Sequence, residues 1–503
     1  MLNENHILVG KGENEVFILP EMANRHGLIC GATGTGKTIT MKVMAESFSS
    51  MGVPVFMADI KGDVSGTARM GTRSEAITKR LEGMGIDPGD FHCRSFPCRF
   101  WDVFGEGGHP VRTTISELGS ELLSRILSLT DAQRGVLAIV FRVADDKGWL
   151  LDDLKDLRAM VSWVCDHSSE LLNDYGNVSK TSAGAVQRAL LQLEDAGGNI
   201  FFGTPSISIS DWMQTDENGM GYINIFHCAK LYRSPLLYST FMLWLLSELF
   251  EELPEVGDPE KPKLVFFFDE AHLLFRDAPK TLVSSVEQVV KLIRSKGVGV
   301  YFVSQQPSDI PNAVLSQLGN KVQHALRAYT PAELKSVKAA AQSFRANPAF
   351  DTEDAILDLG TGEAIVSFLD AKGRPNIAER ATILPPQSDM GAIDDNYRQR
   401  YILTDTMYGK YEDVIDGESA YEKINAIKAA EEEKAKKEEE KKAAAEKKAA
   451  KSTGTTSRKT STASKKKSTA STLLSKTGTS LANTVGRELG KSIARGILGS
   501  IKR

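Results

Sequence analysis

Two hydrophobic patterns alternate along roughly the first 390 residues of this 503-residue chain. Short apolar runs rich in β-branched and aromatic residues indicate buried strands, and apolar positions three or four residues apart indicate helices. A strand at 27–30, a Gly-rich loop, a helix at 39–49 and a strand at 53–58 follow one another directly. This order is typical of a βαβ unit, so we expect an α/β fold with a mostly parallel central sheet. Further strands are predicted at 6–9, 16–19, 221–226, 264–268, 298–303, 321–328 and 363–367.

The strand pattern fades between about 104 and 220, where helical periodicity replaces it. Helices are predicted at 115–129, 133–144, 151–164 and 183–195, and the apolar run 236–246 is interpreted as a buried core helix. We therefore divide the chain into an N-terminal β segment with the first half of the core (1–103), a helical insertion (104–220) and the second half of the core (221–390). Pro385 and Pro386 are expected to close the globular part.

The rest of the chain is polar and changes character twice. Residues 391–450 form a predicted charged helical extension, with pairs such as Glu432–Lys436 four residues apart. Because no apolar seam runs along it, a solvated single helix is favoured over a coiled coil. Residues 451–475 are rich in Ser, Thr and Lys and are predicted to be disordered. Residues 476–503 predict a basic amphipathic helix, with apolar positions every four residues from Leu481 to Ile501.

Charge is distributed unevenly. From Lys451 to Arg503 there are 12 Lys or Arg and one acid, Glu488. That net charge of +11 leaves −15 for the first 450 residues, because the whole chain carries −4. We expect the basic tail to meet an acidic partner, such as DNA, an anionic membrane or a protein.

Composition favours a cytoplasmic protein. The five cysteines are few and scattered, which fits a reducing compartment. No apolar stretch is long enough for a membrane span, and the first residues lack a secretory signal pattern. A zinc site at Cys93 and Cys98 with His92 and His109 is disfavoured, since the spacing is not that of a zinc ribbon.

The strongest chemical motif lies at residues 31–38. Its residues are Gly31, Ala32, Thr33, Gly34, Thr35, Gly36, Lys37 and Thr38, which fit the P-loop pattern completely. Glycines let backbone N–H groups curl around phosphates, Lys37 offers a charge to the β- and γ-phosphate oxygens, and Thr38 offers a hydroxyl to Mg²⁺. Because the motif follows an apolar strand and opens a helix, it predicts ATP as ligand with Mg²⁺ as cofactor.

A second motif, LVFFFDEAH, begins at residue 264. Its apolar strand ends at Asp269 and Glu270, and open α/β sheets bind ligands at such carboxyl ends. We expect Asp269 to hold Mg²⁺ through water and Glu270 to activate the attacking water as a general base. We also expect this strand to finish beside the strand that precedes the P-loop. An adjacent Glu favours hydrolysis over a small-molecule kinase reaction, which must keep water away from ATP.

Three further positions are weaker candidates. Ser304 or Gln305, at the end of the strand 298–303, could contact the γ-phosphate or the lytic water, with structural turn capping as the rival interpretation. Asp59 either lines the same crevice or caps the turn at Gly62. Arg294 could reach the nucleotide of a neighbouring subunit as an arginine finger, although a surface Arg at a helix end is the plainer interpretation. Arg327 is a second such candidate.

Five motifs in order resemble the HerA–FtsK class of P-loop ATPases, and more closely the bacterial HerA-like helicase family. They are NRHGLICGATGTGKT (24–38), MADIKGDVSG (57–66), FDEAHLLF (268–275), KLIRSKGVGVYFVSQQPSDIP (291–311) and LGNKVQHALRAYTP (318–331). The resemblance covers roughly residues 5–390 and implies a RecA-like core, a hexameric ring and double-stranded DNA as substrate. It also implies roles for Gln305 at the strand end and for Arg294 in trans.

Two functions therefore remain open. One is an oligomeric, DNA-dependent translocase or helicase-like ATPase. The alternative is an ATP-driven motor or switch that acts on a protein or at a membrane through the basic C-terminal helix.

Overall fold

In the computed structural model of the chain, the described residues are 2–3, 6–275 and 280–452. Within them, thirteen strands form one sheet in the order β1-β2-β13-β12-β11-β4-β10-β9-β5-β8-β6-β7, with β3 paired to β2. The strands are β1 (Leu2–Asn3), β2 (His6–Lys11), β3 (Glu15–Ile18), β4 (Gly27–Cys30), β5 (Val55–Asp59), β6 (Cys98–Asp102), β7 (His109–Pro110), β8 (Ile223–His227), β9 (Leu264–Phe268), β10 (Val298–Ser304), β11 (Asn320–His324), β12 (Glu363–Ser367) and β13 (Glu379–Ile383). The stretch from β11 to β7 is parallel, whereas β12, β13, β2, β1 and β3 pair antiparallel. The mostly parallel α/β sheet predicted from the sequence is confirmed.

The order of the central strands corrects one prediction. The strand before the P-loop, β4, lies between β11 and β10, and β9 lies between β10 and β5. The expectation that β4 and β9 are neighbours is therefore wrong, because β10 separates them. Crossover helices let strands enter the sheet out of chain order, so chain order does not reveal adjacency. The two strands nevertheless end at the same edge, because β4, β10 and β9 run parallel.

Continuous apolar strands arise because both faces of the sheet are covered. Phe266 and Phe268 of β9 belong to one hydrophobic core, and Phe267 belongs to the core on the other face. Helix α1 contributes Phe48 to the second core, and helix α10 contributes Phe241 to the first. The central strands are thus held rigidly from both sides, and their carboxyl ends present polar residues at fixed positions.

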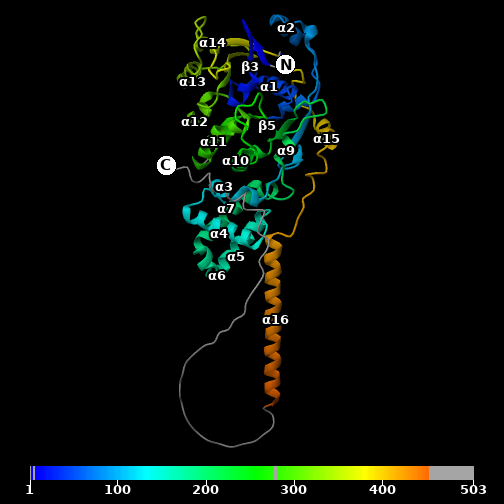
Figure 1. Cartoon of the computed structure of the whole chain (residues 1–503), viewed down its shortest axis with the longest axis vertical. Coiled ribbons are helices and arrows are strands. Elements are labelled where there is room, and N and C mark those ends of the chain that lie inside the picture. The colour runs from blue at the N-terminus through cyan, green and yellow to red at the C-terminus, as the bar shows by residue number, and fades with distance from the viewer. Residues whose placement is uncertain (1, 4–5, 276–279, 453–503) are drawn as a thin grey trace, which may run out of the picture. The chain divides into compact units, whose positions relative to one another are not determined.

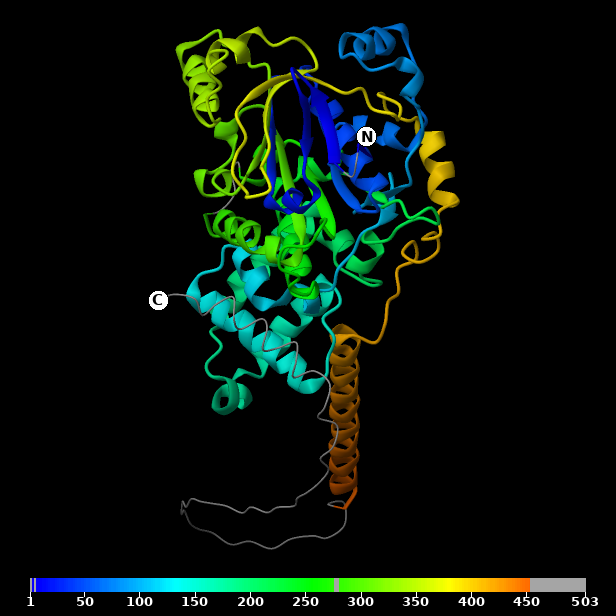
Figure 2. The ribbon, with the colours of Figure 1, turned by 45° about the horizontal axis from the view of Figure 1, so that its top comes forward.

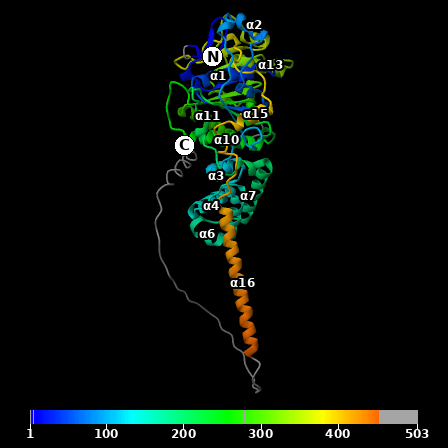
Figure 3. The ribbon, with the colours of Figure 1, turned by 90° about the vertical axis from the view of Figure 1, so that its right-hand side faces the viewer.

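Helices flank the sheet and also form a separate group (Figure 1). The helices of the described residues are α1 (Lys37–Ser50), α2 (Glu75–Gly83), α3 (Ile115–Ile126), α4 (Asp131–Lys147), α5 (Leu154–Asp166), α6 (Ser168–Tyr175), α7 (Lys180–Leu193), α8 (Asn199–Phe201), α9 (Ile209–Trp212), α10 (Pro235–Glu252), α11 (Lys280–Leu292), α12 (Asn312–Leu315), α13 (Pro331–Gln342), α14 (Thr352–Asp358), α15 (Asp395–Leu403) and α16 (Ala420–Ser452). Helices α3 to α9 all lie between β7 and β8 in the chain. Figures 1 and 3 show α4 to α7 gathered at the end of the body opposite α2 and α13.

The compact body continues past Pro385 and Pro386 and includes residues up to Ile424. After α15, residues 404–419 run along the body as a segment that we call the strap; Figure 2 shows it in orange leading to α16. Tyr411 of the strap is buried, and its carbonyl accepts a hydrogen bond of 2.7 Å from Arg112 Nη1. His109 Nδ1 lies 2.6 Å from Glu412 Oε1. The two prolines had suggested that the body ends near residue 390. These buried polar contacts explain why it continues further.

The second compact unit, 425–503, contains most of α16. Its described part is one continuous polar helix in which Lys437 Nζ pairs with Glu433 Oε1 at 2.6 Å. Among the described residues, none of the helices is both long and apolar enough to span a bilayer. The linker predicted at 451–475 and the basic helix predicted at 476–503 fall almost wholly on residues 453–503, outside the described residues.

Candidate nucleotide site

The loop from Gly31 to Thr38 connects β4 to α1 at the carboxyl edge of the sheet. Gly34 and Gly36 adopt φ values of 77° and 117°, which a side chain would strain. Lys37 is only 7% exposed, and its Nζ donates to Gly31 O at 2.7 Å and to Ala32 O at 3.0 Å. The ammonium therefore lies over its own loop, where phosphate oxygens would compete with these carbonyls.

Two segments far away in the sequence support this loop. Ala32 N donates to Ala325 O, and Gly362 N donates to Thr35 O, both at 2.8 Å. His324, at the end of β11, lies 2.8 Å from Thr40 Oγ1 through Nε2 and 2.9 Å from Glu363 O through Nδ1. Burial lowers the pKa of His324 to about 4. The neutral ring then donates from Nδ1 to the carbonyl and accepts at Nε2 from the threonine hydroxyl.

The paired acids follow β9 directly. Asp269 and Glu270 are 4% and 6% exposed, and Asp269 Oδ1 accepts from the backbone N–H of Glu270 at 2.9 Å. Burial, with a further contribution from the charge of Glu270, raises the pKa of Asp269 to about 6. Glu270 has φ 48° and ψ 48°, a left-handed conformation that a non-glycine residue adopts at a cost of about 1–3 kcal/mol.

The loop after β5 adds groups that the sequence interpretation had not assigned. Lys61 Nζ donates to Glu270 Oε1 at 2.6 Å, and Thr38 Oγ1 donates to Asp63 Oδ2 at 3.1 Å. Asp59 is buried and caps the turn by accepting from Gly62 N at 2.7 Å. Burial, followed by the nearby charge of Asp63, raises the pKa of Asp59 to about 7. In the sequence, the stretch DIKGD directly after an apolar strand and within the family motif at 57–66 pointed to this loop, but it gave no role to Lys61 or Asp63.

Electrostatics link the P-loop to the acids. Burial lowers the pKa of Lys37, and the positive charge of Lys61 lowers it further. The negative charges of Glu270 and Asp269 act in the opposite direction. Lys37, Thr38, Asp269 and Glu270 thus meet at one edge of the sheet even though β10 separates their strands. A positive phosphate-binding loop and a pair of buried carboxylates therefore face one another.

The end of β10 lies between these two halves. Ser304 pairs with Cys30 of β4, so Gln305 follows level with Gly31. Ser304 Oγ donates to Asp309 Oδ2 at 2.6 Å, which matches the turn-capping interpretation for this residue. Gln305 is exposed and borders a cavity of about 630 Å³ that His272, Phe275, Gln306, Ser308, Asp309 and Pro311 also line. Of the two candidates, Gln305 has the freer side chain.

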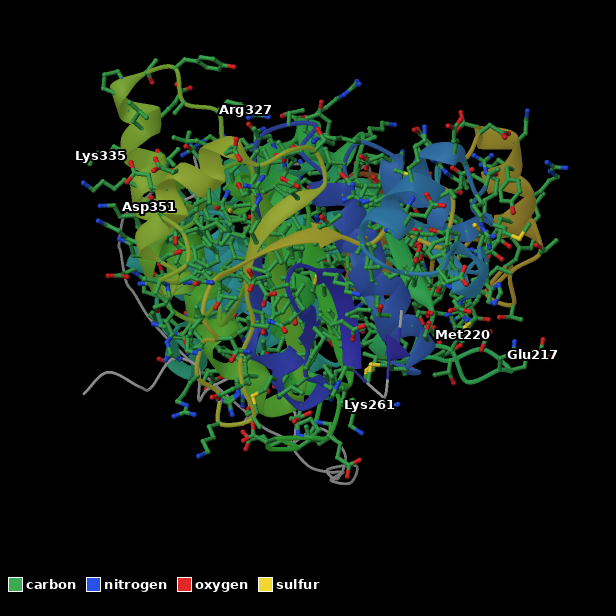
Figure 4. All side chains as sticks on the ribbon, turned by 90° about the horizontal axis from the view of Figure 1, so that it is seen from above. Glu217, Met220, Lys261, Arg327, Lys335 and Asp351 are labelled. Atoms are coloured by element: carbon green, nitrogen blue, oxygen red, sulfur yellow. The ribbon has the colours of Figure 1, made fainter. Side chains whose placement is uncertain are left out.

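Neither candidate arginine lies among these groups. Arg294 precedes β10, at the amino edge of the sheet, and its Nη2 donates to Asp258 Oδ1 at 2.8 Å. Arg327 follows β11 at the carboxyl edge and is exposed, and within the described part of the chain its Nη1 donates a 3.4 Å hydrogen bond to Leu357 O. Figure 4 labels Arg327 near the upper edge of the view from above, with Lys335 and Asp351 further to the left. Within one chain, Arg294 is therefore remote from Lys37.

The donor set fits a magnesium ion bound together with phosphates. Mg²⁺ prefers oxygen ligands and usually takes one or two from the protein. Thr38 and Asp269 offer such oxygens, and Asp63 Oδ1 is buried with no hydrogen-bond partner among the described residues. The same part of the chain contains no group of three or more His, Cys, Asp or Glu arranged to bind a metal by themselves.

The glycine loop follows β4 at the start of a helix, and the paired acids follow β9, with one parallel strand between the two. This arrangement defines a P-loop nucleotide-binding protein with a RecA-like core. The model of the family described as helicase HerA-like, C-terminal, matches residues 4–503. The chain belongs to this family.

Individual relatives are distant. The DNA double-strand break repair helicase HerA of Sulfurisphaera tokodaii is 20% identical over 378 residues, which make up 73% of this chain and 67% of that protein. A structure of the bacterial conjugative coupling protein TrwB lacking its N-terminal segment has a TM-score of 0.51 and 15% identity, covering 78% of this chain and 92% of that chain. A structure of TrwB in complex with the ATP analogue ADPNP has a TM-score of 0.50 and 16% identity, covering 75% of this chain and 88% of that chain. At such identities the solved structures establish the fold alone.

Proposed function

We propose that the protein is an ATP-hydrolysing, Mg²⁺-dependent motor. The observation that supports this most is the meeting of Lys37 and Thr38 with Asp269 and Glu270 at one sheet edge. Nucleotide binding is known for a protein of similar fold, since TrwB has been solved in complex with the ATP analogue ADPNP. The family assignment agrees with the same activity.

Each residue of the site has a chemical task. Backbone N–H groups of Gly31 to Thr38 and the ammonium of Lys37 bind the phosphates. Thr38 and Asp269 hold Mg²⁺, which when bound neutralises charge on the phosphate oxygens. Glu270 accepts a proton as water oxygen bonds to the γ-phosphorus; the bond from that phosphorus to the bridging oxygen breaks, and its electron pair stays on ADP. We propose that Gln305, whose exposed side chain follows β10, orients the same water.

We further propose that the motor is a ring, with six subunits as the expected number, that moves along double-stranded DNA. The name of the S. tokodaii relative supports DNA as substrate. Arg294 lies at the edge of the sheet opposite Lys37 and is exposed enough to meet another molecule. If Arg294 stabilises the transition state, it therefore acts on the nucleotide of a neighbouring subunit. The alternative of a protein or membrane substrate depends on the basic tail and has no support among the described residues.

The test is an ATPase assay of the full chain with Mg²⁺, with and without duplex DNA at low salt. Lys37→Ala should abolish hydrolysis, whereas Glu270→Gln should retain binding of a fluorescent ATP analogue and lose about 10²–10⁴-fold in kcat. Duplex DNA should raise the rate, and light scattering with ATP and Mg²⁺ should give the mass of a closed oligomer. Absence of hydrolysis by the wild type would refute the motor, and absence of DNA stimulation would refute the DNA substrate alone.

A further inference from the structure

The side chain of Glu270 is held by Lys61, a residue that has no part in the mechanism proposed above. Its Oε1 accepts a 2.6 Å hydrogen bond from Lys61 Nζ, and the Glu270 side chain is only 8% exposed. Its Oε2 is buried and has no hydrogen-bond partner among the described residues. His272 Nδ1 lies 3.4 Å from Oε2, which is ion-pair distance without the alignment of a hydrogen bond. One carboxylate oxygen is therefore fixed and the other remains available to accept a proton.

Lys61 is itself presented by a constrained turn. Gly62 N donates to Asp59 Oδ1 at 2.7 Å, Ser65 Oγ donates to Gly62 O at 2.7 Å, and Gly62 has φ 82°. Because β5 is the parallel neighbour of β9, this turn and Glu270 follow adjacent strand ends. The ion pair therefore connects two rigid parts of the sheet edge.

Ordinary surface ion pairs contribute little, with typical values of about 0–1 kcal/mol. The Lys61–Glu270 pair differs because the carboxylate is buried and its backbone is in a strained left-handed conformation. Burial disfavours the charged form of Lys61, but the hydrogen bond to Glu270 and the surrounding acids outweigh it and raise its pKa, so the ammonium persists. A permanent positive charge at this place restricts the rotation of the glutamate side chain.

We propose that Lys61 is a positioning residue, which holds Oε1 of Glu270 so that Oε2 faces the attacking water. The proposal rests on the proposed ATPase function and adds to it a residue that acts through the general base. Lys61 itself need not touch the nucleotide. A misplacement of about 1 Å in such a group can cost about 100-fold in rate.

The test uses Lys61→Met, which keeps the aliphatic stem and removes the charge. The full-length variant should bind fluorescent ATP and ADP analogues with Kd within about twofold of the wild type, and kcat should fall about 30- to 100-fold with KM little changed. Lys230→Met is the matched control, because Lys230 Nζ pairs with Glu106 Oε1 at the same 2.6 Å but in an exposed place. This control should keep wild-type kinetics.

A double-mutant cycle makes the test specific. If Lys61 acts only through Glu270, Lys61→Met combined with Glu270→Gln should be no slower than Glu270→Gln alone. Additive losses would overturn the proposal, as would unchanged or increased kcat in Lys61→Met. A selective loss of ATP over ADP binding would instead indicate a γ-phosphate contact and also overturn it. If the wild type fails to hydrolyse ATP, the proposed function fails before this question arises.

Discussion

At the scale of single residues, His324 shows how a buried imidazole stabilises a phosphate-binding loop without touching phosphate. Its ring connects Thr40, in the first turns of α1, to the carbonyl of Glu363 on β12. The left-handed Gly36 of the loop also packs closely on Gly362. The conformation of the loop therefore depends on residues about 290 or more positions further along the chain.

Replacing this imidazole should weaken nucleotide binding. In His324→Phe the hydroxyl of Thr40 and the carbonyl of Glu363 both lose their partner, at a cost of about 1–3 kcal/mol each where they stay unpaired. We expect the Kd of a fluorescent ATP analogue to rise about 10-fold, which corresponds to about 1.4 kcal/mol. Thr40→Val removes the same hydrogen bond from the other side and should show a similar effect. Equal affinity in wild type and His324→Phe would contradict this role for the ring.

At the scale of elements, helix α1 does more than follow the P-loop. It contains two buried charged residues one turn apart, Lys42 and Glu46. Lys42 Nζ donates to Asp389 O at 2.5 Å, and Glu46 accepts from Gln387 N at 2.8 Å and from Ser388 N at 3.1 Å. The helix therefore binds the segment that follows β13 through charge-assisted hydrogen bonds.

Replacing Glu46 by Ala should lower the stability of the fold and should not act directly on ATP hydrolysis. Glu46→Ala leaves the backbone N–H groups of Gln387 and Ser388 and the Ser388 hydroxyl without their acceptor, and it removes the negative charge that acts on buried Lys42. The free energy of unfolding should therefore fall by about 3–5 kcal/mol. Urea unfolding followed by circular dichroism measures this difference. Glu82→Ala, on the exposed face of α2, is the control and should stay within about 0.5 kcal/mol of the wild type. A loss of less than 1 kcal/mol in Glu46→Ala would show that water replaces the carboxylate.

The sequence predicted those elements whose pattern is local. Strand β9 was predicted from its unbroken apolar run, and helix α1 from the P-loop motif that precedes it. Both patterns can be recognised without knowing which distant residues pack against them. Strand β6 was missed because Arg99 and Asp102 interrupt its apolar residues; both are buried, and Arg99 is satisfied by Gln214 and Thr406, more than 100 residues away. Lys61 was not predicted as a functional residue for a similar reason. A lysine in a turn indicates no function by itself, and its partner Glu270 is 209 residues away in the sequence.

At the scale of the whole molecule, the limit of the folded body follows from the strap and not from the prolines. Arg99 Nε lies 3.4 Å from Asp405, and both side chains are almost fully buried. The hydroxyl of Tyr411 donates to the Asp211 carboxylate of α9, and Lys410 pairs with the same carboxylate at 2.6 Å. Strap residues thus satisfy charges that the sheet and the helical group have buried. The body cannot be complete without them.

Two truncations test this limit. A chain that ends at Ile424 keeps every strap contact and should unfold at nearly the temperature of the full-length protein, with the same basal ATPase rate. A chain that ends at Met390 lacks α15 and the strap, so Arg99 loses Asp405, His109 loses Asp405 and Glu412, and Asp211 loses Lys410 and Tyr411. Each uncompensated buried charge costs about 3–5 kcal/mol, and the sum exceeds much of the stability of a typical domain. Differential scanning calorimetry should therefore show no cooperative transition for the shorter chain; a transition near that of the full-length protein would place the end of the body at residue 390 after all.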